Sequence, residues 1–191
     1  MGITFSVLAK RVTVTGSVLS RIGRTMAPFY RKIAADLNYA RQWTRATRQT
    51  DLKEMERLFK RVTSSTMSAG SNSFGYMNGF LFAAPVYFYE CGTMLAPGTV
   101  RSGAVFKTSI HRRISRAVLP LYSKLASCKT YAAAVAKAIN RRSSSELKAL
   151  LAPYIKSAYI RGIRYEYGGF TISFRYPDSR YFYHNFAAKG F

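Results

Sequence analysis

The stretch that decides the fold class lies near the end of the chain, where residues 163–186 read IRYEYGGFTISFRYPDSRYFYHNF. Apolar and polar side chains alternate along it, which is typical of strands with one buried face. Gly168-Gly169 and Pro177-Asp178-Ser179 interrupt the alternation, and these residue types favour tight turns. We therefore predict a three-stranded antiparallel meander over 163–186, with one aromatic face and one polar, basic face.

The aromatic face of this meander has two interpretations. Nine Tyr or Phe residues lie between Tyr165 and Phe186, and aromatic sheets can stack nucleic-acid bases. On a sheet accompanied by helices, however, an aromatic face usually packs against the core. We therefore assign Tyr165, Phe170 and Phe174 to packing. We expect a polyanion along the opposite face and along the predicted helix that carries Arg112 and Arg116.

A second β-structure is predicted near residues 74–89. Asn78-Gly79 is flanked by apolar residues, which is the strongest short-range signal for a hairpin. Residues 62–100 contain no Lys or Arg, and Glu90 is their only acid. We expect this hairpin to face another protein rather than phosphate. The predicted protein-interaction residues are Phe74, Tyr76, Phe80, Phe82, Tyr87 and Tyr89.

Helical periodicity dominates the rest of the chain. We predict two helical pieces after Ser17, separated at Pro28, and further helices after Ser109. Asp51 with Glu54 and Ser143 with Glu146 form capping boxes at two helix starts. We expect no internal repeat. The predicted class is α+β, with a basic N-terminal arm and helices over 1–50 and a compact domain over 51–191.

The charge is strongly unbalanced, with 30 Lys and Arg against 8 Asp and Glu and a formal net charge of +22. The excess lies in two blocks, residues 1–50 (net +8) and 101–191 (net +14). Such an excess opposes compaction unless an anionic partner neutralises it. Arg outnumbers Lys, which favours bidentate contacts with phosphate. The predicted phosphate contacts are Arg112, Arg113, Arg116, Arg141, Arg142, Arg164, Arg175 and Arg180.

Few residues are suited to catalysis. The chain has two histidines and none of the common phosphate-loop, zinc-protease or nucleophile-elbow motifs. We expect a non-catalytic protein without cofactor, metal or small-molecule substrate, and free thiols at its two cysteines. One catalytic alternative stays open, a small metal-independent ribonuclease. It would use Glu166 as base and His184 as acid, with Arg164 and Arg175 on the phosphate.

Several settings fit these properties. The first 35 residues lack Asp and Glu and have the composition of a mitochondrial transit segment, although a basic arm along a polyanion explains them as well. We expect no transmembrane helix. The preferred setting is a ribosome-like particle, mitochondrial if that signal is real, or a virion component, with RNA favoured over DNA and other protein subunits as neighbours.

The competing class is a basic supernumerary subunit of a mitochondrial respiratory or ATP-synthase complex that meets anionic lipid. Phe29-Tyr30-Arg31 resembles, at two of its three positions, the Leu-Tyr-Arg triad of small mitochondrial assembly and respiratory-complex subunits. The resemblance covers only these three residues.

Overall fold

The computed structural model describes residues 13–63, 71–73, 77–84, 87–96 and 105–189. They form an α+β fold, as predicted. The helices are α1 (Gly16–Ala35), α2 (Leu37–Gln49), α3 (Leu52–Lys60), α4 (Thr108–Ser127), α5 (Lys129–Asn140) and α6 (Ser144–Leu151), with a 3-10 turn η1 (Ala152–Tyr154). The strands are β1 (Ser71–Ser73), β2 (Met77–Ala84), β3 (Tyr87–Leu95), β4 (Ile160–Glu166), β5 (Gly169–Arg175) and β6 (Phe182–Lys189).

All six strands belong to one antiparallel sheet in the order β1-β2-β3-β6-β5-β4. The C-terminal meander is confirmed as β4, β5 and β6, and Gly168 supplies the positive φ of 71° in its first turn. The hairpin near 74–89 is confirmed as β2 and β3, whose pairing ends with Ala84 opposite Tyr87. The predicted turn at Asn78-Gly79 is wrong, because both residues lie inside β2 and pair with Thr93 and Gly92.

The first helical region also differs from the prediction. α1 continues through Pro28 and ends at Ala35. The next residue, Asp36, caps α2 by accepting a hydrogen bond from the Tyr39 N–H at 2.9 Å. At both predicted capping boxes the N-cap contact is confirmed, since Asp51 accepts from the Glu54 N–H at 3.0 Å and Ser143 from the Glu146 N–H. The second contact of a capping box is not formed, because the Asp51 and Ser143 N–H groups donate to the Ala46 and Ala138 carbonyls. The sequence therefore predicts where these helices begin better than where a helix is interrupted.

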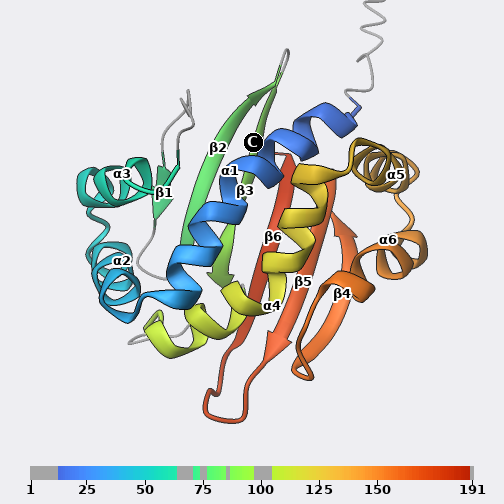
Figure 1. Cartoon of the computed structure of the whole chain (residues 1–191). Coiled ribbons are helices and arrows are strands. Elements are labelled where there is room, and N and C mark those ends of the chain that lie inside the picture. Colours follow the sequence, from blue (N-terminus) through green and yellow to red (C-terminus); the bar gives the residue numbers. More distant parts are fainter. Residues whose placement is uncertain (1–12, 64–70, 74–76, 85–86, 97–104, 190–191) are drawn as a thin grey trace, which may run out of the picture.

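α1 and α4 lie next to each other across one face of the sheet, with α2 and α3 on one side and α5 and α6 on the other (Figure 1). One hydrophobic core runs from Val14 to Ala187 beneath these two helices. The expected division at residue 50 falls between α2 and α3, and α1 and α2 contribute to this same core. The N-terminal helices are thus part of the packed body.

The chain contains an internal repeat, so the expectation of none is wrong. Each half has three helices followed by three strands, and α4 begins 92 positions after α1 with the same length of 20 residues. The segments RIGRTMAPFYRKIAA (21–35) and RISRAVLPLYSKLAS (113–127) are identical at seven of fifteen aligned positions. This shift relates Pro28 to Pro120 and Tyr30 to Tyr122.

The same shift of 92 extends through the other helices. It relates the helix cap Asp51 to the helix cap Ser143, and Thr50 to Arg142, which have φ values of 55° and 57°. Strands β3 and β6 are related by a shift of 94 instead of 92. Tyr87-Phe88-Tyr89 then aligns with residues 181–183, again Tyr-Phe-Tyr.

The two halves meet around a pseudo-twofold axis. The strand order is unchanged when the halves are exchanged, and β3 and β6 pair antiparallel at the centre. The equivalent residues Tyr30 and Tyr122 lie together, with ring centroids 4.8 Å apart. The axis therefore passes between α1 and α4 and between the central strands.

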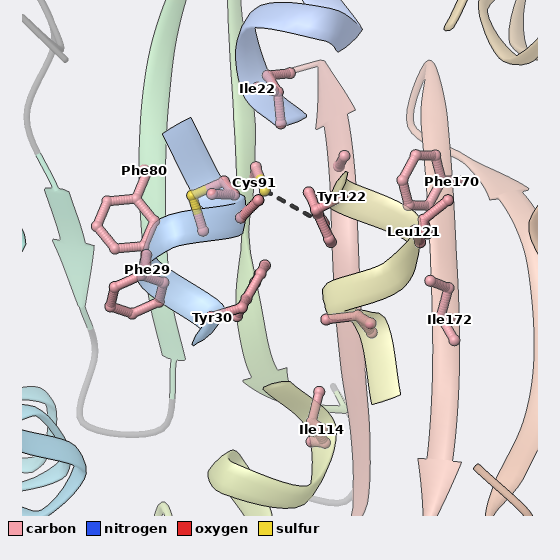
Figure 2. Packing of buried hydrophobic residues seen from close by; sticks show 14 of the residues in the cluster. Ile22, Phe29, Tyr30, Phe80, Cys91, Ile114, Leu121, Tyr122, Phe170 and Ile172 are labelled. Carbon is pink, nitrogen blue, oxygen red and sulfur yellow. Dashed lines mark hydrogen bonds between the residues drawn. The ribbon is translucent and has the colours of Figure 1, made fainter. Parts of the chain in front are cut away.

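A buried polar network crosses this axis. Asn185 accepts a hydrogen bond from the Tyr122 hydroxyl at 3.0 Å and donates to Tyr30 Oη at 2.7 Å and to the Gly92 carbonyl at 2.9 Å. The equivalent of Asn185 in the first half is Cys91, whose Sγ lies 3.4 Å from Tyr122 Oη (Figure 2). Burial raises the pKa of this thiol to about 12. The amide thus ties both equivalent helices to both central strands.

The cores of the two halves have diverged. The first is aromatic where the second is aliphatic, and Figure 2 shows Phe29 and Phe80 on one side of the axis and Leu121 and Ile172 on the other. The aligned pairs are Phe29 and Leu121, Trp43 and Val135, Phe59 and Leu151, and Phe80 and Ile172. Both sets are buried. The same backbone therefore accepts two different packings.

The opposite face of the sheet carries no helix within the described part of the chain. Phe88 and Phe182, which are equivalent in the repeat, are 50% and 37% exposed on this uncovered face. Met77, Phe186 and Ala188 form a small apolar cluster between them. The two faces of the sheet thus differ in both covering and composition.

Candidate polyanion-binding surface

The cations are concentrated in the helical layer, which we define as helices α1 to α6. Of the 27 described Lys and Arg residues, 17 lie in these helices, four in β4 to β6 and none in β1 to β3. All eight acids are described. Four of them belong to the first half, where they lie in helices or cap them. The layer is therefore the most cationic part of the described chain.

Few of these cations are neutralised within the chain. Five ion pairs connect described residues: Lys32–Asp36, Arg57–Glu54, Lys60–Glu56, Arg113–Asp178 and Arg141–Glu146. All lie at partly exposed positions, where an ion pair contributes at most about 1 kcal/mol. The hydrogen bond from Arg113 lowers the pKa of the Asp178 carboxyl below its ordinary value of 3.8. These pairs leave most of the positive charge uncompensated.

Three of the predicted phosphate contacts, on α4, make internal contacts. Arg112 donates to the carbonyls of Ile33 (3.3 Å) and Ala34 (2.9 Å) at the C-terminal end of α1. Arg116 donates to the same Ala34 carbonyl at 3.4 Å. Arg113 pairs with Asp178 and lies 4.5 Å from the Tyr176 ring centroid. These side chains hold α4 to its neighbours, although their charge still contributes to the surface potential.

The other five predicted contacts are spread over the molecule. Arg141 pairs with Glu146, and Arg175 donates to the Arg180 carbonyl. Arg164 is exposed on the uncovered face of the sheet, whereas Arg142 follows α5 and lines a cleft at the end of the sheet. The structure therefore does not gather the eight predicted arginines into one site.

The predicted protein-interaction residues have mixed positions. Phe80, Phe82 and Tyr89 point into the core and are at most 3% exposed, so their side chains are not on the surface. Tyr87 is half-buried, and Phe74 and Tyr76 lie outside the described residues. Among the described residues of this hairpin, the exposed aromatic residue is Phe88. Successive residues of a strand point to opposite faces of the sheet, so Phe88 is exposed although Tyr89 is buried.

Sequence reasoning missed the cations of the N-terminal helices as contacts. Arg31 on α1 and Arg41 and Arg45 on α2 are exposed. Arg41 and Arg45 are four residues apart and share one side of α2. The available signal was their position opposite the buried stripe of Tyr39, Ala40 and Trp43.

The residues of the ribonuclease alternative do share one face. Strand register places Arg164, Glu166, Arg175 and His184 on the uncovered side of β4, β5 and β6. Burial lowers the pKa of His184, Glu166 raises it and Arg164 lowers it. Arg164 and Glu166 lie on β4 and His184 on β6, with β5 between these two strands.

Metal and membrane sites are not evident in the described residues. Among them, no three His, Cys, Asp or Glu side chains are grouped as metal ligands would be. No described helix combines the length and the hydropathy that crossing a membrane requires.

No protein-family model, curated protein or solved structure matches the chain.

Proposed function

We propose that this protein is a non-catalytic structural subunit of a large assembly, and that its helical layer holds nucleic acid by the phosphate backbone. The supporting observation is that 17 of the 27 described cations lie in the helices, opposite a sheet face of mixed charge that carries Glu90 and Glu166 as well as Arg164 and Arg175. A cation that neutralises a phosphate releases bound counterions, which gives affinity without sequence preference. RNA in a ribosome-like particle, mitochondrial or not, is the preferred setting, and a packaged viral genome is the other.

The uncovered sheet face suits the protein neighbours of such an assembly. Its exposed Phe88 and Phe182 and its apolar cluster at Met77, Phe186 and Ala188 lie away from the helical layer. Interfaces between proteins are enriched in aromatic side chains and depleted in charges at their centre. The two faces would then serve two classes of partner.

The test is equilibrium binding of the purified protein to generic single-stranded RNA at salt concentrations from about 50 to about 400 mM, where the affinity of phosphate-binding proteins depends strongly on salt. The proposal expects affinity to fall steeply and linearly on a log-log plot. Vesicles containing anionic lipid form the second arm. Binding to vesicles without binding to RNA would instead favour the respiratory or ATP-synthase alternative.

A second candidate is the metal-independent ribonuclease, which the common face of Arg164, Glu166 and His184 favours. General acid–base catalysis needs such groups within hydrogen-bond reach of one substrate. Incubation of RNA with the protein in EDTA tests this candidate, with His184→Ala as the comparison. RNA that stays intact with the wild-type protein removes the candidate, and cleavage that is lost in His184→Ala supports it.

A further inference from the structure

A polar cleft of about 80 Å³ lies where the second repeat meets the end of the sheet, on the side of the helices. It is formed by the segment before α1, the end of α5 and its following turn, and the ends of β3, β4 and β6. Its lining residues are Thr13, Val14, Tyr87, Ile139, Asn140, Arg142, Tyr165, Gly168 and Lys189. The space exceeds the roughly 30 Å³ that one water molecule occupies in the liquid.

Two of the described residues that line the cleft are cations, and none of these described residues is an acid. Arg142 and Lys189 come from the turn after α5 and the end of β6, and none of the five ion pairs between described residues includes either. Lys189 Nζ lies 5.6 Å from the Tyr87 ring centroid. The cleft is therefore electropositive and has a partly aromatic wall.

The walls are held by backbone contacts. Asn140 binds both polar groups of Val14, accepting from its N–H at 2.9 Å and donating to its carbonyl at 2.8 Å. The Lys189 N–H donates to the Tyr167 carbonyl at 2.9 Å, and the Tyr87 hydroxyl donates to the Thr13 carbonyl at 3.3 Å. Because these anchors fix the walls, the cleft needs little reorganisation to accept a ligand.

The first repeat shows that the fold does not require these cations. At the equivalent place Arg48 Nε donates to the Phe106 carbonyl at 2.7 Å, as Asn140 does to Val14. The positions of Arg142 and Lys189 are there occupied by Thr50 and Leu95. Arg142 and Lys189 therefore occur only in the second repeat, at a junction that the first repeat forms with Thr50 and Leu95.

We propose that this cleft binds one phosphate group, held by the Arg142 guanidinium and the Lys189 ammonium. Guanidinium groups present paired N–H donors that match phosphate oxygens, and an ammonium adds a second charge. The cleft holds one such group and no large organic moiety. If the phosphate belongs to bound nucleic acid, this proposal rests on the function proposed above. If it is free phosphate, the proposal is independent of that function.

The test compares the full-length protein with the double variant Arg142→Thr/Lys189→Leu, which installs the residues of the first repeat. Threonine fits this position, since Thr50 has the same left-handed backbone. The control Arg141→Thr/Lys137→Leu removes the same charge from neighbouring exposed positions outside the cleft. Urea unfolding verifies that both variants fold.

Binding of inorganic phosphate is measured by calorimetry at constant ionic strength, balanced with chloride. We expect one site in the wild-type protein, a loss of affinity of at least about tenfold in the double variant and less than about twofold in the control. Equal affinity in the two variants, or no phosphate binding by the wild type, would overturn the proposal.

A second arm distinguishes the source of the phosphate. Short RNA with and without a 5′-phosphate is titrated into the wild-type protein and the double variant. If RNA binds both proteins equally while phosphate binding differs, the cleft takes free phosphate. If RNA does not bind at all while phosphate binds in the cleft, the proposed function fails and the cleft remains.

Discussion

The histidine at position 111 makes stability depend on pH in a way that one substitution removes. His111 is fully buried on α4 between the rings of Phe29 and Phe106, and neither ring nitrogen has a hydrogen-bond partner in the described structure. Burial lowers its pKa from 6.5 to about 3. The equivalent residue of the first repeat is Leu19. His111→Leu is therefore a replacement that the same backbone already accepts.

The sign and size of the effect follow from proton linkage. Below pH 6.5 the unfolded chain binds a proton at this histidine, whereas the folded chain does not until about pH 3. Stability is therefore lost as the pH falls, by up to about 1.4 kcal/mol per pH unit. Between pH 7 and pH 5 the loss amounts to about 2 kcal/mol, because the unfolded imidazole becomes almost fully protonated.

Urea unfolding at pH 5, 6 and 7 measures this loss for the wild-type protein and for His111→Leu. The variant should lack about 2 kcal/mol of the pH dependence and should be no less stable at pH 7, because two unpartnered nitrogens are removed. His184 titrates equally in both proteins, so their difference isolates His111. An identical pH dependence in the two proteins would refute the buried, neutral state of this residue.

Two further predictions concern the repeat. Asn185→Ala should destabilise the protein by about 3 kcal/mol, because it leaves the buried hydroxyls of two tyrosines and the Gly92 carbonyl without their shared partner. Urea unfolding measures this loss, with Asn38→Ala at an exposed position as the control. Equal stability of the two variants would contradict the network. Asp51→Ala and Ser143→Ala should each cost about 1 kcal/mol, since both remove a helix cap at equivalent positions. Unfolding midpoints unchanged by either cap substitution would be inconsistent with this.

Local patterns predicted the local structure well. The meander and the N-caps at Asp51 and Ser143 depend on short-range rules, namely strand alternation, turn residues and hydrogen bonds three residues apart. The prediction that the helix is interrupted at Pro28 is wrong because a proline removes only one helical hydrogen bond. The packing of α1 on α4 stabilises the helix on both sides of this proline. Asn78-Gly79 misled because β2 is paired on both sides there, so tertiary contacts outweigh the local preference for a turn.

The repeat and the candidate sites needed the structure. Where the two halves align, most core residues differ in type, as Trp43 and Val135 do, so similarity is concentrated in α1 and α4. The sequence identified the arginines but not their partners, and Arg112 contacts carbonyls 78 residues earlier in the chain. The cleft of Arg142 and Lys189 unites positions 47 residues apart. Only tertiary contacts bring such residues together.

The most direct test of the nucleic-acid proposal compares two triple variants in RNA binding against salt. One changes Arg31, Arg41 and Arg45 of the helical layer to Gln, and its control changes Lys107, Lys156 and Arg161, which lie outside the helices and are also exposed. Each lost phosphate contact should reduce the log-log slope by about 0.7. The account predicts a slope lower by about 2 for the helical-layer variant and an unchanged slope for the control. Equal slopes for the two variants and the wild type, or a loss confined to the control, would contradict it.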